Sequence, residues 1–228
     1  MKKLFNNILV PLRADDAGSM ILEEVERMAG QWQCRIHTLD NPDEGTIVEY
    51  CIRHEIDLVL LERKTGGLWR FLQRRRELRT DRLLKRLQCP ILTTSGQPAT
   101  ASMKNIVLPV GSGLPTRKLL FATYLARTAG STIHLVTMDE SSGKASRESG
   151  ESLFRSYRLL RENTSLPVEC LSLPGESLAD VAWRYARDIK ADLILINPGK
   201  ESLLSGWSDG WFTRAIFNVS RIPVLTVR

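Results

Sequence analysis

A loop rich in glycine and hydroxyl groups is the first place where the residue types suggest chemistry. It follows the apolar run 192–196 and carries Gly199, Lys200, Ser202, Ser205 and Gly206. Glycine lets backbone amides approach a phosphate, hydroxyl groups can donate to it, and a lysine ammonium can neutralise its charge. We therefore consider an adenine nucleotide or another anion as a ligand of the second half. The candidate binding residues are Gly111, Gly199, Lys200, Ser202 and Gly210. The alternative is an ordinary surface loop.

A second group of residues suited to anions lies in the segment 63–86. It holds ten basic residues against two acidic ones, a net charge of +8 in a chain whose net charge is +6. On a helix, four arginines would lie along one face, namely Arg75, Arg79, Arg82 and Arg86. Such a face could bind the phosphates of nucleic acid or of an acidic lipid surface. Because aromatic residues that stack on bases are sparse here, we favour a solvated face or a surface for a protein partner over nucleic acid.

Histidine and cysteine give no sign of catalysis. His37 and His134 hold matched places in two similar segments, which indicates repeated architecture, and His54 has no second histidine at ligand spacing. The cysteines have no C-x-x-C spacing and lie in or beside apolar segments, as reduced packing thiols do. We recognise no metal cluster and no nucleophile with a paired base. The sequence therefore predicts a protein that is not an enzyme, with no catalytic residue and no metal.

The chain repeats itself. Four short segments of the first half return in the same order in the second half. The pairs are 7–12 with 105–110, 36–39 with 133–136, 57–61 with 192–196, and 89–93 with 222–226. A shared order of four segments indicates a duplicated domain. The uncharged segment 95–102 suits a linker, so we expect domains at 1–96 and 103–228.

The repeated segments are short, continuously apolar runs, which is typical of parallel strands covered on both faces. Helical patterns lie between them, for example Ile21, Val25, Met28 and Trp32. Strand alternating with helix predicts an α/β fold of two tandem, doubly wound parallel sheets. We expect the halves to be related by a pseudo-two-fold and to pair through their closing strands.

The second half is the longer one. His134 and Asp192 are 58 residues apart, whereas His37 and Asp57 are 20 apart. The extra length holds a helix at 153–160 and a strand at 168–173, so we expect five strands in the second domain and about four in the first. The segment 139–152 has almost no apolar residues and predicts a loop. In the helix after residue 115, the expected apolar stripe is Leu120, Phe121, Tyr124, Leu125 and Thr128.

The matched segments resemble those of the universal stress protein family. The likeness covers almost the whole chain as a tandem pair with a shortened first copy, and rests on the Asn-Ile-Leu-Val-Pro opening strand, the Asp-Leu fourth strand and the Pro-Ile-Leu or Pro-Val-Leu closing strand. It implies an adenine-nucleotide-hydrolase-like fold that dimerises through its last strand. Some members of the family bind ATP and others do not.

The residues that the resemblance links to ATP are largely missing. ATP-binding members carry an aspartate after the first strand, where this chain has Arg13 and Gly111. They also carry a spaced glycine signature ending in a hydroxyl residue after the fourth strand. Its three glycine positions are Glu62, Thr65 and Arg75 in the first copy, and Asn197, Lys200 and Gly210 in the second, where Trp211 replaces the hydroxyl residue.

The resulting hypothesis is a non-enzymatic regulatory or interaction protein with degenerate nucleotide sites. The alternatives are a sensor of adenine nucleotide or another anion in the second domain, and a nucleic-acid or anionic-surface binder that uses the segment 63–86. We expect no cofactor, intramolecular pairing of the two domains, a protein partner and a homodimer as one possible assembly. With 43% hydrophobic residues and no apolar run near the roughly 20 residues needed to span a bilayer, we expect a cytoplasmic protein without a transmembrane segment.

Overall fold

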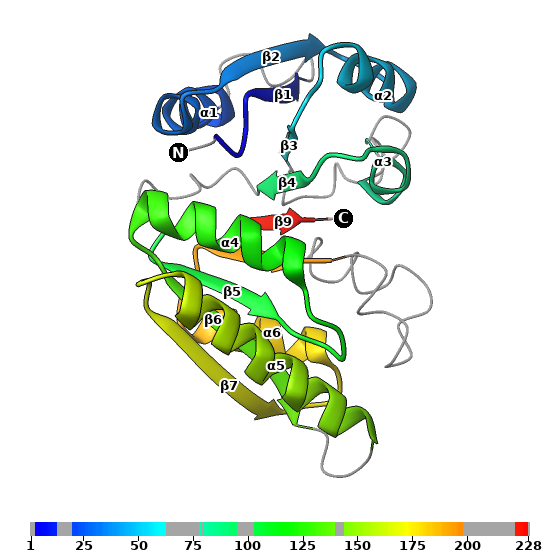
Figure 1. Cartoon of the computed structure of the whole chain (residues 1–228). Helices are drawn as coiled ribbons and strands as arrows, with labels where there is room; N and C mark the ends of the chain where they lie inside the picture. The colour runs from blue at the N-terminus through cyan, green and yellow to red at the C-terminus, as the bar shows by residue number, and fades with distance from the viewer. Residues whose placement is uncertain are drawn as a thin grey trace. The chain divides into compact units, whose positions relative to one another are not determined.

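The computed structural model describes residues 3–12, 20–62, 78, 80–94, 103–139, 144–197 and 222–227 (Figure 1). The chain divides into two compact units, Met1–Pro98 and Ala99–Arg228. The division falls within the uncharged segment 95–102. Strands and helices alternate along both units, as the apolar runs and the helical patterns between them require.

The first unit contains a parallel sheet with the strand order β2-β1-β3-β4. Its register places Ile8 beside both Ile36 and Leu58, and Leu60 beside Leu92. The elements in chain order are β1 (Asn7–Leu12), α1 (Met20–Trp32), β2 (Arg35–Asp40), α2 (Glu44–Arg53), β3 (Leu58–Glu62), α3 (Thr80–Arg86) and β4 (Ile91–Thr94).

The second unit contains a parallel sheet with the strand order β9-β8-β5-β6-β7. Its elements in chain order are β5 (Asn105–Pro109), α4 (Thr116–Ala129), β6 (Thr132–Asp139), α5 (Lys144–Asn163), β7 (Val168–Pro174), α6 (Leu178–Asp188), β8 (Leu193–Ile196) and β9 (Val224–Thr226). In Figure 1, α4 and α5 lie in front of this sheet and α6 lies behind it. The expected α/β class of doubly wound parallel sheets is confirmed, with α5 and β7 as the additional helix and strand.

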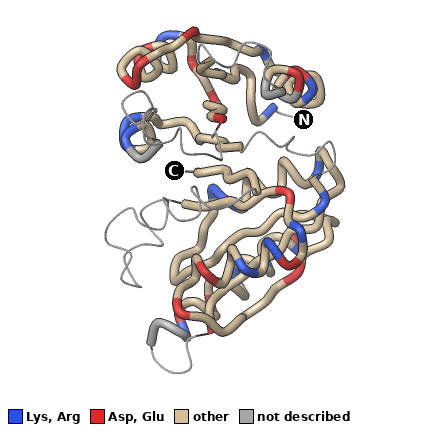
Figure 2. The backbone as a smooth tube through the Cα atoms, turned by 180° about the vertical axis from the view of Figure 1, so that it is seen from behind, with Lys and Arg blue, Asp and Glu red and all other residues tan. Residues whose placement is uncertain are grey.

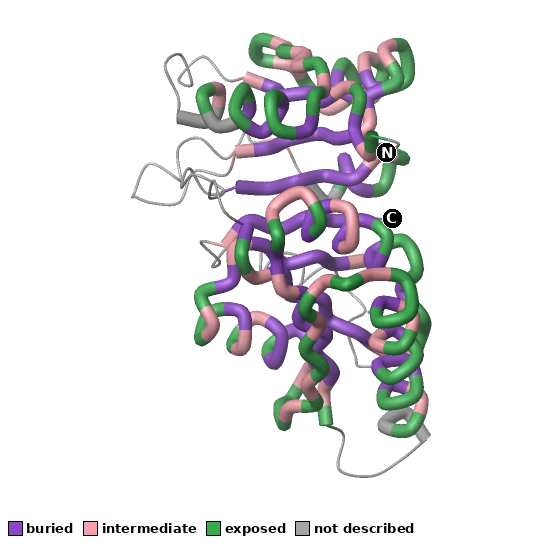
Figure 3. Tube along the Cα trace, turned by 60° about the vertical axis from the view of Figure 1, so that its left-hand side comes forward, coloured by how far each residue is buried: buried purple, intermediate pink, exposed green. Residues whose placement is uncertain are grey.

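The inner strands form the core of each unit. In β1, Ile8, Leu9 and Val10 are all buried, and β8 is buried along its whole length (Figure 3). The outer strands β2 and β7 instead alternate between half-buried and exposed residues. Consecutive burial follows from helices on both faces of a parallel sheet, whereas an outer strand keeps part of its surface in water. The sequence patterns of β1, β8, β2 and β7 thus follow from how far each strand is covered.

Helix α5 corrects one expectation. The segment 139–152 was expected to be a loop, but the helix already begins at Lys144. Its buried face consists partly of serine, and the hydroxyl of Ser156 donates to the carbonyl oxygen of Ser152 at 2.8 Å. A serine that bonds within its own helix can be buried without an unsatisfied polar group. Small hydroxyl residues therefore form a buried face that the apolar pattern did not show. The buried residues of α5 are Ser149, Ser152, Leu153, Ser156 and Leu160.

Helix α4 corrects a second expectation. Leu120 was placed on the apolar stripe, but its side chain is 60% exposed. The buried face of α4 includes Ala122, Ala126 and Leu119. Successive residues of a helix point in different directions, so Leu120 lies outside this face. The expected burial of Phe121 and Leu125 is confirmed, and the full buried set is Lys118, Leu119, Phe121, Ala122, Leu125 and Ala126.

The ends of two helices follow from local chemistry. Ser177 caps α6 by accepting a hydrogen bond from the amide of Asp180 at 3.1 Å. Gly130 ends α4 in the left-handed conformation, with a φ of 69°, which glycine adopts without strain. Among the residues that the structure describes, no helix combines the length and the apolar character needed to cross a membrane.

The serine face of α5 can be tested by substitution. We expect Ser156→Leu to lower the free energy of unfolding by about 1–3 kcal/mol, because the larger side chain would have to enter a packed contact. Ser156→Ala should change it by less than about 1 kcal/mol, since the side chain stays small. Urea unfolding followed by circular dichroism measures both. A Ser156→Leu variant as stable as the parent protein would show that this face is not packed.

Candidate functional site

The carboxyl end of β5 is the place where the second sheet can bind a ligand. Strands β6 and β8 lie on opposite sides of β5, so the direction of winding reverses there, and open α/β sheets bind ligands at such a point. After β5, the amide of Val110 donates to the carbonyl oxygen of Val136 at 2.8 Å, and the half-buried Gly111 follows. Asn197 is half-buried directly after β8. These residues are the described part of this end of the sheet.

A buried lysine lies at the same end of β5. The side chain of Lys118 is fully buried on α4, and its Nζ donates to the carbonyl oxygen of Pro109 at 2.5 Å. The carbonyl of Val110 also receives a hydrogen bond, from the hydroxyl of Thr137 at 2.8 Å. Lys118 thus places a basic side chain at this end of the sheet. The sequence reasoning missed Lys118, although its place on the inward face of α4 was a readable signal.

The structure describes one of the predicted ligand residues, and it lies at the carboxyl end of β5. Gly111 follows β5 as expected, close in sequence to the Pro109 carbonyl that Lys118 contacts. The other predicted residues, Gly199, Lys200, Ser202 and Gly210, lie outside the described residues. The described residues at this end of the sheet therefore belong to the loop after β5, the start of α4 and the end of β8.

The arginine face is described in part. Arg82 and Arg86 are exposed on α3, while the three leucines at 83, 84 and 87 are buried. Figure 2 marks the Lys and Arg positions along the backbone in blue. Arg75 and Arg79 lie outside the described residues. Hydrogen bonds from Thr46 hold the pKa of the Asp43 carboxyl below its ordinary value, and the charge of Arg86 adds to this effect. Part of the basic face thus lies near an acidic group of its own unit.

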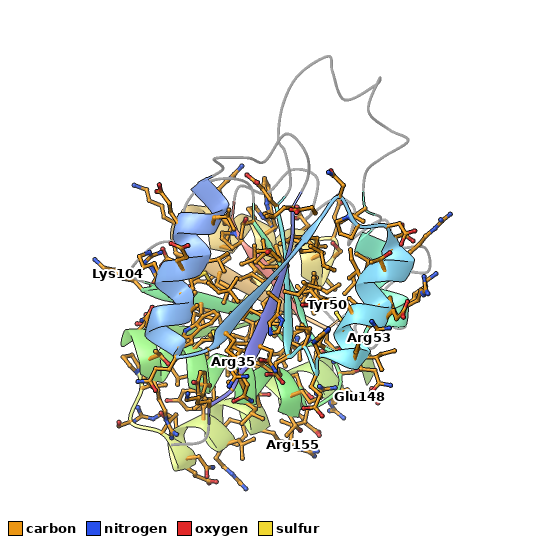
Figure 4. All side chains as sticks on the ribbon, turned by 90° about the horizontal axis from the view of Figure 1, so that it is seen from above. Arg35, Tyr50, Arg53, Lys104, Glu148 and Arg155 are labelled. Carbon is orange, nitrogen blue, oxygen red and sulfur yellow. The ribbon has the colours of Figure 1, made fainter. Side chains whose placement is uncertain are left out.

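A polar network that the sequence reasoning did not identify joins β1, β2 and α2. The Nδ1 of His37 lies 3.1 Å from the hydroxyl of Tyr50, and its Nε2 lies 3.3 Å from Oδ1 of Asn7. The amide nitrogen of Asn7 donates to the carbonyl oxygens of His54 and Glu55, so Oδ1 faces His37 and accepts from Nε2–H. The His54 ring stacks on Tyr50 at a centroid distance of 4.0 Å. Figure 4 labels Tyr50 within this unit.

The second unit repeats the network and adds a carboxylate. His134 places Nδ1 at 2.9 Å from the hydroxyl of Tyr185 and Nε2 at 3.2 Å from Oδ1 of Asn105. Glu169 brings Oε2 to 3.1 Å from the same Nδ1. Burial lowers the pKa of His134, and Glu169 works in the opposite direction. Burial, assisted by Glu169, raises the pKa of Tyr185 to about 12. Tyr185 therefore stays protonated, and its hydroxyl donates to Oε2 of Glu169 at 3.4 Å.

An aspartate fixes the start of each network. Oδ2 of Asp57 accepts from the amides of Asn6 and Asn7 at 2.6 and 3.0 Å. Oδ2 of Asp192 accepts from the equivalent amides of Lys104 and Asn105 at 2.7 and 2.9 Å. A tyrosine seven residues before each aspartate was the signal that comparison of the two halves could have found. Within the described ranges no cluster of three metal-ligating side chains occurs. Each aspartate joins the strand that it precedes to the first strand of its unit.

The role of Glu169 yields a prediction on pH. Because burial lowers the pKa of His134, the unfolded state binds the proton first, and this histidine costs stability as the pH falls below about 6.5. Glu169→Gln removes the group that opposes the shift. We expect a lower His134 pKa in an NMR titration, and an additional loss of unfolding free energy between pH 7 and 5 of less than about 1 kcal/mol, since the exposed carboxylate is screened.

Glu176→Gln provides the matched control, because Glu176 is also an exposed carboxylate of the second unit but has no contact with His134 among those described. It should leave the His134 titration unchanged. An unchanged or higher His134 pKa in Glu169→Gln would contradict the assigned role.

Comparison with known proteins gives matches of structure alone. No family model and no curated protein matches the sequence. A protein of unknown function from Pseudomonas aeruginosa PAO1 is 16% identical, with a TM-score of 0.70 over 99% of this chain and 93% of that chain. A provisionally named universal stress protein from Pseudomonas aeruginosa UCBPP-PA14 is also 16% identical, with a TM-score of 0.70 over 99% and 94%. A universal stress protein from Archaeoglobus fulgidus DSM 4304 is 11% identical, with a TM-score of 0.67 over 98% and 96%. The chain therefore has the α/β fold of solved universal stress proteins.

Proposed function

We propose that this protein is a non-enzymatic regulatory or interaction module of the universal stress type with eroded nucleotide sites. The carboxyl end of β5 carries the proposal. Gly111 stands where the resemblance implies an aspartate, and the buried Lys118 ammonium lies 2.5 Å from the Pro109 carbonyl oxygen. Glycine offers no carboxylate to accept hydrogen bonds from the hydroxyl groups of a ligand, so a contact that the resemblance links to ATP is absent at this position.

The first unit supports the same proposal. Its third strand ends at Glu62, a half-buried residue at the position where the glycine signature would begin. A carboxylate at this position would repel a phosphate, whereas the backbone amides beside a glycine would attract one. Both copies thus depart from a phosphate-binding pattern, and they do so through different residues.

The histidine networks support a role without catalysis. Both ring nitrogens of His37 and of His134 have hydrogen-bond partners, as described above. A general base needs a free lone pair within reach of its substrate. In both rings Nδ1 faces a tyrosine hydroxyl, and in His134 it also faces the Glu169 carboxylate. The proposal therefore assigns no proton transfer to either histidine.

Lys118 favours one rival, an anion sensor at the crevice of the second unit. A buried ammonium beside the start of α4 would attract a phosphate or a similar anion. The anion sensor and the interaction module differ in the ligand that each must bind. The sensor requires an anion that depends on Lys118, whereas the interaction module requires only its folded surface and a protein partner.

Calorimetry tests the proposal. We expect no Mg-ATP affinity tighter than about 0.1 mM, which corresponds to about 5.5 kcal/mol of binding free energy, and no hydrolysis. Inorganic phosphate forms the second titration, repeated with Lys118→Met and with Lys200→Ala. Micromolar binding of Mg-ATP that Lys200→Ala abolishes would overturn the eroded-site proposal. Phosphate binding lost in Lys118→Met would favour the anion sensor.

Native mass spectrometry of the purified chain is the accompanying measurement. We expect no nucleotide to accompany the protein, and the same spectrum reports whether the chain is a monomer or a homodimer. Pairing of the two halves through their closing strands and the identity of a protein partner remain predictions.

A further inference from the structure

The sheet of the first unit ends in a strand with a single neighbour. Among the residues that the structure describes, β2 pairs with β1 on one side and with no strand on the other (Figure 1). In the second unit the equivalent strand, β6, lies between β5 and β7. The second unit thus shows how a strand covers an edge that the described part of the first unit leaves uncovered.

The backbone of β2 presents hydrogen-bonding groups to this outer edge. The amide of Arg35 donates to the carbonyl oxygen of Asn6, on the side of β1, at 2.7 Å. Successive residues of a strand turn their backbone groups to opposite sides. The backbone groups of Ile36, Thr38 and Asp40 therefore point away from β1 and toward the outer edge.

Strand β7 uses the equivalent groups of β6 in the second unit. The amide of Ile133, which corresponds to Ile36, donates to the carbonyl oxygen of Pro167 at 2.9 Å, and the register sets His134 beside Glu169. With β7 in place, five consecutive residues of β6 are buried, whereas every residue of β2 is half-buried or exposed. This difference in burial marks the surface of β2 that a further strand would cover.

The charges beside β2 indicate the chemistry of such a strand. In the second unit, Glu169 brings a carboxylate to 3.1 Å from Nδ1 of His134. Within the described residues, His37 has the equivalent tyrosine and asparagine partners but no carboxylate beside it. Burial lowers the pKa of His37, and the positive charges of His54 and Arg35 lower it further. An acidic residue opposite His37 would supply the carboxylate that Glu169 supplies in the second unit.

We propose that the outer edge of β2 is a docking site for an extended segment of a protein partner that carries an acidic residue opposite His37. The segment would run parallel to β2, as β7 runs along β6, and would add main-chain hydrogen bonds at Ile36 and Thr38. Its apolar residues would cover Ile36 and Leu39, which are half-buried in β2. The inference rests on the proposed function as an interaction module, and it specifies the chemistry of the partner.

The charged ends of β2 make this edge selective. Arg35 and Asp40 are both exposed. An uncharged apolar strand along β2 would partly remove both charges from water and offer them no partner, which disfavours non-specific pairing. A segment with an acidic residue opposite His37 places a negative charge two residues from Arg35, so attraction offsets part of this cost.

Hydrogen exchange of the full chain tests whether the edge is open. After correction for intrinsic rates, we expect the outward amides of Ile36 and Thr38 to exchange at least about tenfold faster than the inward amides of His37 and Leu39. Equal protection of the two sets would overturn the proposal, because the edge would then already be covered. Protection of the outward amides that grows with protein concentration would assign the edge to a second copy of this chain, and would also overturn it.

A peptide with the sequence 166–175 is the binding probe, because β7 covers the equivalent edge in the second unit. It carries Cys170→Ser to prevent disulfide formation, and its ends are blocked. We expect a Kd below about 1 mM for the isotope-labelled full chain, with NMR shifts at Ile36 and Thr38. The amide of Leu135 should not shift, because the chain's own β7 already pairs with β6.

The same peptide with Glu169→Gln tests the role of the carboxylate. It should bind about two- to fivefold more weakly, which is the effect of one partly screened ion pair. A parent peptide that leaves the β2 signals unshifted would overturn the proposal. So would equal binding of the two peptides.

Substitutions at Thr38 test the backbone pairing. Thr38→Pro removes the outward amide and leaves the hydrogen bonds to β1, because proline is tolerated on the open side of an outer strand. We expect it to abolish peptide binding, whereas the matched control Thr38→Val keeps the amide and should bind as the parent chain does. Circular dichroism of both variants checks the fold. Peptide binding that survives in a folded Thr38→Pro variant would contradict pairing with β2.

The outcomes separate this docking site from the proposed function. Micromolar binding of Mg-ATP would overturn the eroded-site proposal whatever the peptide does. A chain that binds neither Mg-ATP nor the peptide would keep the proposed function and lose only this docking site.

Discussion

The carboxylates of Asp57 and Asp192 each hold two consecutive backbone amides at the start of the first strand of their unit. This contact fixes the position of Asn7 or Asn105. The asparagine in turn holds the histidine ring, and the histidine contacts a tyrosine of the following helix. One charge-assisted contact therefore sets the relative positions of two neighbouring strands and a helix. The loops at the opposite, carboxyl ends of the strands begin from the frame that these contacts fix.

Comparison of the two units separates the contacts that the fold requires from the residues that a ligand site requires. The network of asparagine, histidine, tyrosine and aspartate occurs in both copies with the same partner atoms. The residues at the carboxyl ends differ, with Glu62 ending β3 and Asn197 following β8. Contacts inside the protein constrain the network, whereas a crevice needs particular residues only if a ligand uses them. This difference agrees with the proposed erosion of the nucleotide sites.

The strands were predictable because each apolar run is buried by contacts that nearly every parallel strand makes. The start of α5 was not predicted, because part of its buried face is serine. The Ser156 hydroxyl bonds to the Ser152 carbonyl oxygen within the helix, and a search for periodic apolar residues does not detect such a face. The position of Lys118 on the inward face of α4 was readable, but its hydrogen bond was not, because the acceptor is the carbonyl oxygen of Pro109 in the preceding strand. Of the predicted ligand residues only Gly111 lies within the described part of the chain. Contacts between side chains of different elements depend on tertiary packing that periodicity does not encode.

The outer strands β2 and β7 have a consequence for the behaviour of the protein in concentrated solution. An outer strand presents unpaired backbone groups that can recruit a strand from another molecule. Here β2 begins with the exposed Arg35 and ends with the exposed Asp40, while β7 carries the exposed Glu169 and ends at Pro174, which has no amide hydrogen. Charges and a missing donor make edge-to-edge association unfavourable, so these strands protect the chain against aggregation.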